Sequence, residues 1–422
     1  MGGELATASD QVPTQEERFR RRWPKRLSAT LSILAALVVV PTAIGSVLPG
    51  IPIVGLAAAV LTGFYALHLV LIGIGGAAAA IVARRLTARK RFVTVIVLNT
   101  VAAVILVVPL FSQVIAAERA GAKISWMAHM IMGAPLPKLQ PSRTVEYATL
   151  AGRRLFLDIY DPSHRVLSAQ STPVIMIHGG GFLYGHRSDG RDWDRWFAER
   201  GYTVFDVDYR LTPPVSWNLA AQDVACAMSW VREHQRTLNV SAAHTLIVGQ
   251  SAGASLALQV AYGIGDDSVK SSCGGVVEAP IAVFALYPVE DFRLAWRENL
   301  RVGPANGRDI NIGYIGGSPQ EFPERYQAVS PVDHVRAGIP PTMIAFGAHD
   351  HLVPVIGHGA LSAKLQTLGV PRVFLEIPYS DHGYDLVWGS LGGQTTRAVL
   401  SRFLAEHCPA AARVTGTQAK EG

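Results

Sequence analysis

Hydrophobic residues follow two contrasting patterns along this 422-residue chain. In the first part they form three long runs without a charge, over residues 27–48, 53–83 and 92–117. Each run is long enough, as an α-helix, to cross a bilayer core of about 30 Å. The pattern therefore predicts three transmembrane helices, and Pro41 is expected to kink the first of them.

Two other interpretations of the apolar runs are weaker. The basic stretch before Leu27 resembles the start of a cleavable signal peptide, but two further apolar runs favour a retained anchor. Buried core helices are the alternative for each run, and three uncharged runs in succession argue against it. Small residues in the second run, among them Gly73, Gly75 and Gly76, would let the helices pack closely.

Positive charge is concentrated beside these runs. The net charge is +6, with six basic residues within residues 1–26 and five within residues 84–91. Basic and acidic residues are nearly equal in number elsewhere, which argues against a nucleic-acid-binding surface. Because basic loops stay on the cytoplasmic side of a membrane, the clusters predict a multi-pass protein of the cell membrane. Everything after Ala117 is then extracytoplasmic.

From Arg143 onward, short apolar segments alternate with helical ones. Parallel strands require helical crossovers, so this alternation predicts a mainly parallel sheet that begins with a hairpin across Ala151-Gly152. The expected strands cover residues 144–150, 153–160, 173–178, 202–208, 245–250, 281–287, 342–347 and 372–377. The expected helices cover residues 190–200, 218–237, 252–263, 355–369 and 392–406.

The chain is thus expected to divide into segments of different character. These are a cytoplasmic basic tail (1–26), a membrane anchor (27–117), a linker (118–142), a folded domain (143–407) and a disordered tail (408–422). Ile124, Met127 and Ile131 lie on one helical face of the linker. That face would either lie along the membrane surface or pack on the domain.

One segment joins an apolar strand to a small-residue helix through a glycine-flanked serine. Residues 249–253 read Gly-Gln-Ser-Ala-Gly, a G-x-S-x-G motif. Between a strand and a helix, this motif holds a nucleophilic serine at a strained turn, and glycines permit the close backbone approach. Ser251 is the predicted nucleophile. The alternative is a glycine-rich turn that merely contains a serine.

A second glycine-rich segment, His178-Gly179-Gly180-Gly181-Phe182, follows an expected strand. An acyl-transfer site needs converging backbone N–H groups and no side chains that would block the acyl group. We therefore expect the N–H groups of Gly180, Gly181 and Ala252 to form an oxyanion hole. A flexible linker is the alternative.

A nucleophilic serine needs a base, and the base needs an acid that orients it. His382 follows the last expected strand and Asp350 the strand before it, so both fall at the carboxyl edge of the sheet. The order Ser251, Asp350, His382 is that of α/β-hydrolases.

Other residues compete for these roles. Glu290 and Asp291 are alternative acids, whereas Asp381 and Asp385 are poorly placed in sequence to reach the far nitrogen of His382. A zinc site is the competing interpretation of the histidine-rich segment. Its ligands would be His349, Asp350, His351 and His358.

Residues 143–407 resemble α/β-hydrolases of the hormone-sensitive-lipase-like and BD-FAE-type esterase group. The matching motifs are HGGGF at 178–182 with Gly185, DYRL at 208–211, Asp223 with Trp230, GQSAG at 249–253, SPVDHV at 330–335, GAHDHLVP at 347–354 and DHGYD at 381–385. The resemblance implies a carboxylic-ester hydrolase with the triad and oxyanion hole named above. Pro213-Pro214 and His351 depart from the family pattern, which affects the substrate class rather than the mechanism.

The sequence thus predicts an α/β-hydrolase with an eight-stranded, mainly parallel sheet behind three transmembrane helices. We expect a serine esterase that acts through an acyl-enzyme on small-molecule or lipid esters, with no metal or organic cofactor and no nucleic-acid partner. An acyltransferase acting on lipid or sugar hydroxyls and an inactive binding module are the alternatives. Transport is disfavoured because no charged residue lies within a span.

The insertion before the seventh expected strand and the cysteines give two further expectations. An insertion at residues 291–338 is expected to roof an apolar acyl pocket with its aromatic residues, Phe292, Trp296, Tyr314, Phe322 and Tyr326. The three cysteines, Cys226, Cys273 and Cys408, show neither metal spacing nor a disulfide framework. One disulfide with a free thiol and three buried thiols both fit this pattern.

Overall fold

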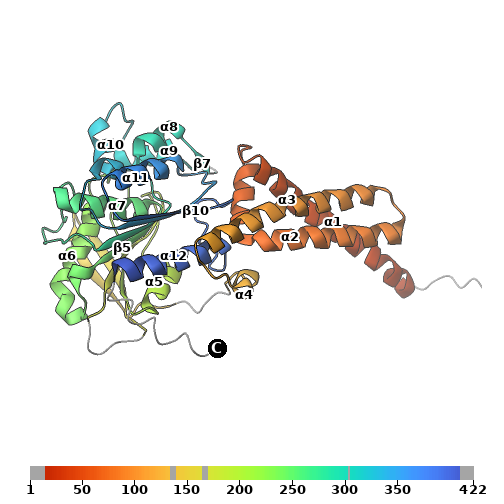
Figure 1. Ribbon diagram of the computed structural model, residues 1–422, viewed down its shortest axis with the longest axis horizontal. Helices are drawn as coiled ribbons and strands as arrows, with labels where there is room; N and C mark the ends of the chain where they lie inside the picture. Colours follow the sequence, from red (N-terminus) through yellow and green to blue (C-terminus); the bar gives the residue numbers. More distant parts are fainter. Residues whose placement is uncertain (1–14, 134–138, 164–169, 303–304, 409–422) are drawn as a thin grey trace, which may run out of the picture. The chain divides into compact units, whose positions relative to one another are not determined.

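The computed structural model describes residues 15–133, 139–163, 170–302 and 305–408. They form two compact units, one made of most of the first three helices and the other of the remaining chain (Figure 1). Most of the two terminal tails, and Pro135 and Pro137 of the linker, lie outside the described residues.

The first unit is made of most of three long apolar helices: α1 (Gln15–Val47), α2 (Val54–Thr87) and α3 (Arg91–Arg119), the last of which belongs to this unit as far as Leu110. Each contains a stretch long and apolar enough to cross a membrane, over Arg22–Val47, Val54–Thr87 and Arg91–Arg119. The helices extend beyond the uncharged runs because the flanking basic residues continue the helical backbone.

Small and polar residues set the packing of this unit. A Cβ atom at Gly76 would lie 2.4 Å from Oδ1 of Asn99, and one at Gly73 would lie 2.8 Å from the Cβ of Ala103. A Cβ at Gly75 would meet open space. The Asn99 amide of α3 donates to the backbone oxygen of Ser32 on α1 at 3.2 Å. The expected close packing is therefore confirmed at two of the three glycines.

The second unit is built on an eight-stranded sheet in the order β1-β2-β4-β3-β5-β6-β9-β10. The strands are β1 (Arg143–Leu150), β2 (Arg153–Tyr160), β3 (Pro173–Ile177), β4 (Thr203–Val207), β5 (Leu246–Gln250), β6 (Ala282–Leu286), β9 (Thr342–Gly347) and β10 (Arg372–Ile377). Strands β1 and β2 form the predicted antiparallel hairpin, β2 pairs antiparallel with β4, and the other pairs are parallel. The predicted fold class is confirmed.

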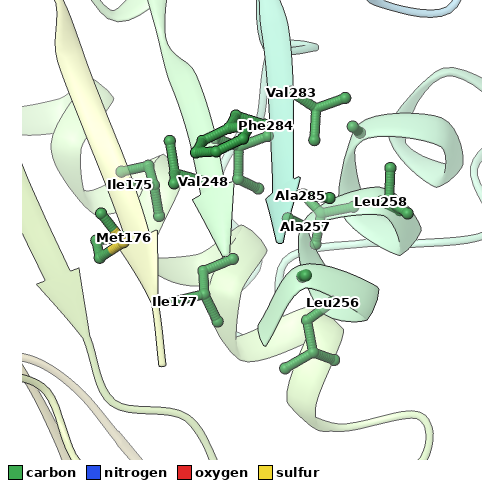
Figure 2. Close-up of a cluster of buried hydrophobic side chains, with 14 of the residues drawn as sticks. Ile175, Met176, Ile177, Val248, Leu256, Ala257, Leu258, Val283, Phe284 and Ala285 are labelled. Atoms are coloured by element: carbon green, nitrogen blue, oxygen red, sulfur yellow. The ribbon is translucent and has the colours of Figure 1, made fainter. Parts of the chain in front are cut away.

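Helices cover both faces of this sheet, α7 and α11 on one side and α5 and α12 on the other (Figure 1). The main ones are α5 (Arg191–Ala198), α6 (Ala220–Leu238), α7 (Ala252–Gly263), α11 (Ile356–Thr367) and α12 (Leu391–His407). Figure 2 shows side chains of β3, β5 and β6 packed together with those of α7. Since central parallel strands are covered on both faces, they appear in the sequence as continuous apolar runs rather than alternating ones.

The remaining elements are short. They are α4 (Trp126–Met130), η1 (Ala242–His244), η2 (Ile264–Asp266), α8 (Phe292–Glu298), β7 (Arg301–Val302), β8 (Ala305–Asn306), α9 (Gly307–Ile315), α10 (Pro323–Val329) and η3 (Pro331–His334). Six of these elements lie wholly within the insertion expected at residues 291–338. It is therefore a small helical layer inserted between β6 and β9.

Candidate active site

Ser251 occupies the turn between β5 and α7. Its backbone has φ 53° and ψ −119°, an unfavourable conformation for a residue with a side chain. A Cβ at Gly249 would lie 2.2 Å from the oxygen of Gly253, and one at Gly253 would lie 2.2 Å from the oxygen of Ile177. The motif therefore needs both glycines so that the turn can pack against β3 and hold Ser251 at its tip.

The three residues of the predicted triad meet at the carboxyl edge of the sheet. His382 Nε2 lies 2.9 Å from Ser251 Oγ, and His382 Nδ1 lies 2.8 Å from Asp350 Oδ2. The other Asp350 oxygen accepts 2.8 Å hydrogen bonds from the backbone N–H groups of Leu352 and Val353. These bonds fix the carboxylate, which in turn orients the imidazole toward Ser251.

Burial and charge act in opposite directions on His382. Burial lowers its pKa because the imidazolium loses hydration, whereas the charge and hydrogen bond of Asp350 raise it. Asp381 and Asp385 add smaller effects in the same direction as Asp350. The net result is a pKa above the ordinary value of 6.5. The site therefore stabilises a protonated His382, the form that follows proton transfer from a serine.

The competing acids have other partners. The Glu290 carboxylate pairs with His358, and both side chains are buried. Asp291 caps α8 and pairs with Arg293 at 3.0 Å. Neither competing acid has a hydrogen bond or ion pair with His382 among the described residues. Asp350 is the acid that the fold brings to the base.

The four residues of the competing zinc interpretation each interact with a different partner. His351 Nδ1 lies 2.9 Å from Asp381, His358 pairs with Glu290, and Asp350 pairs with His382. His349 packs its ring against Tyr379. Within the described ranges, no group of three or more His, Cys, Asp or Glu side chains is arranged to hold a metal ion.

The glycine-rich loop after β3 faces Ser251. Gly180 has φ 112°, and a Cβ there would lie 2.0 Å from the oxygen of Tyr184. The Gly180 oxygen accepts from the N–H groups of Leu183 and Tyr184 at 3.1 Å, which folds the loop into a tight turn. Gly180, Gly181 and Ser251 line one cavity, and Ala252 is the first residue of α7. The expected oxyanion donors thus border the serine.

Aromatic packing supports the same loop. His178 stacks on Tyr209 with ring centroids 4.4 Å apart, and the Tyr209 hydroxyl donates to the His178 oxygen at 3.0 Å. Phe182 stacks on Tyr314 of α9 at 3.7 Å. The loop is therefore held from two sides, by the DYRL segment and by the insertion.

A cavity of about 460 Å³ opens beside Ser251. Its lining is mostly apolar and comes from the glycine-rich loop, the serine turn, α9 and the loops after β6, β9 and β10. The lining residues are Gly179, Gly180, Gly181, Leu183, Tyr184, Gly185, Asp189, Gln250, Ser251, Tyr287, Ile310, Leu352, His382, Gly383 and Leu386. Its volume and lining suit a small apolar ligand.

The expected role of the insertion aromatics is wrong. Phe292, Tyr314 and Tyr326 are fully buried in the core, and none of the five named aromatic residues lines the cavity. The insertion reaches the cavity through Ile310 of α9 instead. An aromatic side chain in an insertion can face a core or a cavity, and sequence alone does not distinguish the two.

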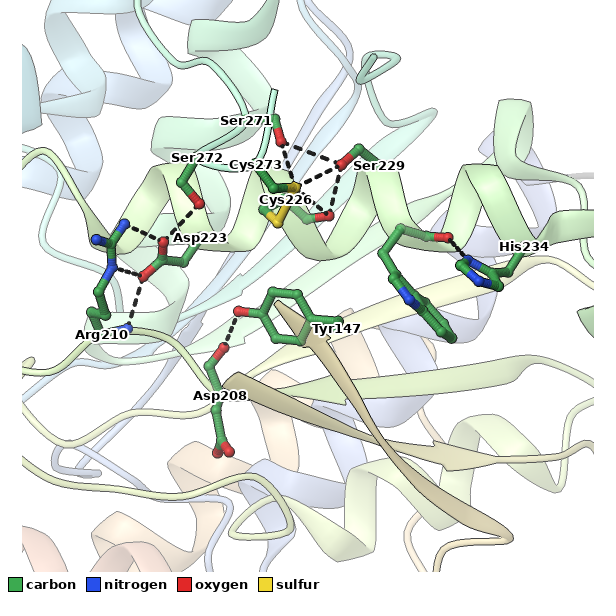
Figure 3. The surroundings of a disulfide bond; sticks show 11 residues. Tyr147, Asp208, Arg210, Asp223, Cys226, Ser229, His234, Ser271, Ser272 and Cys273 are labelled. Atoms are coloured by element: carbon green, nitrogen blue, oxygen red, sulfur yellow. Dashed lines mark hydrogen bonds and ion pairs between the residues drawn. A yellow bond between two sulfur atoms is a disulfide. The ribbon is translucent and has the colours of Figure 1, made fainter. Parts of the chain in front are cut away.

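A disulfide bond joins Cys226 of α6 to Cys273, 47 residues later, with Cα atoms 5.4 Å apart (Figure 3). Beside it, Asp223 accepts hydrogen bonds from Arg210 at 2.6 and 2.7 Å and from Ser272 at 2.8 Å. The bridge and the buried ion pair connect α6, the DYRL segment and the loop that contains Cys273. Cys408 is buried and is not in a disulfide.

Comparison with known proteins agrees with this geometry. Residues 157–365 match the BD-FAE family model. The chain is 29% identical over 261 residues to the probable carboxylic ester hydrolase LipM and 24% identical over 235 residues to the esterase LipC, both from Mycobacterium tuberculosis. The matches cover 60% and 54% of this chain. They span 59% and 56% of the relatives, less than two thirds of their length.

The fold is also shared with solved structures. Esterase 2 of Thermogutta terrifontis with bound butyrate has a TM-score of 0.52 and 23% identity, and the match covers 68% of this chain and 98% of that one. Its apo form has a TM-score of 0.51, with 65% and 97% coverage, at 22% identity. These likenesses concern the fold.

Proposed function

Since this chain carries an α/β-hydrolase domain of the esterase type, we propose that it is a membrane-anchored serine carboxylic-ester hydrolase. The observation that carries the proposal is the hydrogen-bonded series Ser251–His382–Asp350 beside an apolar cavity. We assign residues 143–407 to the catalytic domain, residues 27–117 to the anchor and residues 118–142 to the linker.

The proposed reaction has two steps. His382 Nε2 takes the Ser251 proton as Oγ attacks the ester carbonyl, and the N–H groups of Gly180, Gly181 and Ala252 stabilise the oxyanion. His382 then gives its proton to the leaving alcohol, which breaks the ester bond and leaves an acyl-enzyme. Water, deprotonated by His382, attacks that acyl group and releases the acid and free Ser251. Asp350 keeps the imidazole oriented throughout.

The cavity supports esters with short or medium acyl groups as substrates. Leu183, Ile310, Leu352 and Leu386 supply an apolar lining that would bind an acyl chain by excluding water. Ser251 and His382 also line this cavity, so the ester carbonyl would react beside the apolar surface. The curated relatives are named as esterases or ester hydrolases, which is consistent with this class.

Three apolar helices and two basic clusters support an anchor with the catalytic domain on the extracytoplasmic side. The disulfide provides an argument of a different kind. Disulfides persist in oxidising compartments and are rare in the cytosol. The bridge between Cys226 and Cys273 therefore favours the same side of the membrane as the charge pattern.

The test is hydrolysis of a p-nitrophenyl ester series, from acetate to palmitate, by detergent-solubilised full-length protein and by Ser251→Ala. The proposal expects a burst and turnover that Ser251→Ala abolishes, with a chain-length optimum set by the cavity. Acylation without turnover until an acceptor alcohol is added would instead identify an acyltransferase. No reaction, or equal reaction of both proteins, would contradict the assignment and favour a binding module.

A further inference from the structure

The two basic clusters of the sequence meet at one cavity in the helical unit. Its volume is about 460 Å³, and its lining includes Arg22, Lys25 and Arg26 of α1 together with Arg89 and Arg91 around the α2–α3 turn. The three α1 residues are spaced i, i+3 and i+4, so they share one helix face. Arg26, the last of them, precedes Arg89 by 63 positions in the sequence.

No counter-charge is available within this part of the chain. The cavity has no acidic residue in its lining, and residues 18–117 contain no Asp or Glu at all. All five cationic side chains are exposed. Five like charges around one cavity repel one another, and a bound anion relieves this repulsion. The anion must therefore come from outside residues 18–117.

The cavity also has an apolar side. Phe92 is 1% exposed, and Ala29 and Leu86 complete this part of the lining. The uncharged run of α1 begins immediately after Arg26. Trp23, which is 54% exposed, lies about one helical turn before Arg26. Aromatic and basic residues at the end of an apolar span mark the headgroup level of a bilayer. The cavity thus combines cations with apolar surface at that depth.

We propose that this cavity binds the phosphate-bearing headgroup of an anionic phospholipid. The cations contact the phosphate, and the apolar side receives the glycerol backbone and the first carbons of an acyl chain. Basic pockets between transmembrane helices on the cytoplasmic side bind anionic headgroups by this chemistry. The proposal rests on the proposed membrane anchor, and a free phosphate ion would use the same cations.

The test compares two variants of equal charge. Arg89→Gln/Arg91→Gln removes cations from the cavity, whereas Arg84→Gln/Arg85→Gln removes the same charge from the last turn of α2, outside the lining. Full-length protein in a neutral detergent is titrated with phosphatidylglycerol or phosphatidylcholine, and bound lipid is counted by native mass spectrometry. Each juxtamembrane cation contributes roughly fivefold to affinity.

We expect wild type and Arg84→Gln/Arg85→Gln to prefer phosphatidylglycerol, and Arg89→Gln/Arg91→Gln to bind it roughly 30-fold more weakly than wild type. Equal loss in both variants would mean that only overall charge matters and would overturn the site. Displacement of the lipid by millimolar inorganic phosphate would show that the cavity binds free phosphate rather than a lipid headgroup and would overturn the proposal. Unchanged binding in Arg89→Gln/Arg91→Gln would also overturn the proposal.

Two parallel measurements separate this proposal from the proposed function. Alkaline carbonate extraction of membranes tests the anchor, and release of the protein would refute the anchor. Hydrolysis of p-nitrophenyl acetate by the same samples tests the esterase. A protein that stays in the membrane and hydrolyses esters, but shows no lipid preference, would refute the headgroup site alone.

Discussion

The Tyr287 hydroxyl donates a 2.8 Å hydrogen bond to Asp385, while the Tyr287 ring lies against His382 with ring centroids 4.4 Å apart. Asp385 is buried and also accepts from Trp193 Nε1 at 2.7 Å and from Gln250 Nε2 at 3.2 Å. Gln250 directly precedes the serine. One carboxylate thus connects the serine turn with the ring that supports the base, without touching either reacting atom.

We predict that Asp385 is a positioning residue. Asp385→Asn leaves one of three donors facing an amide N–H group and removes a charge that raises the pKa of His382. The expected result is a kcat lowered about tenfold, in line with a charged hydrogen bond of about 1.5–3 kcal/mol. The acidic limb of the kcat/KM profile should also move to lower pH. Stopped assays of p-nitrophenyl acetate hydrolysis across pH measure both effects.

Tyr384→Phe is the matched control for this prediction. The Tyr384 hydroxyl is also buried but bonds to Thr396 at 2.8 Å and not to Asp385. Its loss should lower stability without moving the pH profile. If Asp385→Asn unfolds more easily but keeps the wild-type kcat and profile, Asp385 has only a structural role.

A second prediction concerns the acid of the triad. The proposed base must be neutral, and its pKa lies above 6.5, so kcat/KM should fall as the pH drops through a value above 6.5. Burial lowers the pKa of His382, and in Asp350→Asn the carboxylate that opposes this effect is gone. The acidic limb of the kcat/KM profile should therefore move to lower pH. The loss in kcat should be about 10⁴-fold, as for other serine triads.

Glu290→Gln provides the comparison, because Glu290 pairs with His358 rather than His382. It should keep the acidic limb and most of kcat while lowering the unfolding temperature. The opposite outcome is a large loss of kcat in Glu290→Gln and a small one in Asp350→Asn. It would assign the role of the acid to Glu290, in the loop after β6.

The strands could be predicted because strands that are buried on both faces appear in the sequence as continuous apolar runs. Strand β9, which is buried along its whole length, was expected at residues 342–347 and is observed there, and the order of Ser251, Asp350 and His382 follows from the strands they succeed. The roles of these residues remain predictions, although the fold brings them within hydrogen-bond distance.

Contacts made by side chains far apart in sequence could not be predicted in the same way. Asp385 stands inside a recognised motif, but its partner Trp193 lies 192 residues earlier. Ile310 reaches the cavity because of the orientation of α9, which no local pattern specifies. The pairing of Cys226 with Cys273 depends equally on where the loop after α7 returns to α6.

A third prediction concerns that disulfide. Closing a loop of this length removes conformational entropy from the unfolded chain, equivalent to about 4 kcal/mol in the simplest model. Cys226→Ser/Cys273→Ser should therefore lower the free energy of unfolding by about 2–4 kcal/mol, measured by chemical unfolding in detergent. Neither cysteine lines the cavity, so kcat/KM at room temperature should change little. Cys408→Ser is the control; full stability in the double variant would contradict a structural role for the bridge.

A fourth prediction follows from two fully buried carboxyl groups, Asp194 of α5 and Asp206 of β4. Burial raises the pKa of Asp206 to about 8, while the Ser188 N–H bonded to it opposes this effect. Burial, followed by the Asp206 charge, also raises the pKa of Asp194. An acid with a raised pKa stabilises the fold fully below its ordinary pKa of 3.8, and this contribution is lost as the pH rises to about 8.

Asp206→Asn should therefore be more stable than wild type. The difference in the free energy of unfolding should grow between pH 4 and 8 and stay constant above pH 8. Its amide can still accept from Ser188 and can donate toward Asp194. Each unit of pKa shift corresponds to about 1.4 kcal/mol, so a gain of roughly 2–5 kcal/mol is expected at alkaline pH. Urea unfolding of the full chain in detergent, followed by tryptophan fluorescence, measures it.

Asp266→Asn is the control of opposite sign. Burial raises the pKa of Asp266, but its bonds to Ser268 and His334 outweigh this and lower it below 3.8. The stability that Asp266 contributes is therefore present above pH 3.8 and lost as the pH falls further. Asp266→Asn should be less stable than wild type by an amount that does not grow as the pH rises from 5 to 9, because the ion pair with His334 requires a protonated histidine. A stability difference for Asp206→Asn that likewise does not grow over this range would show that Asp206 is already ionised in the fold and would refute the raised pKa.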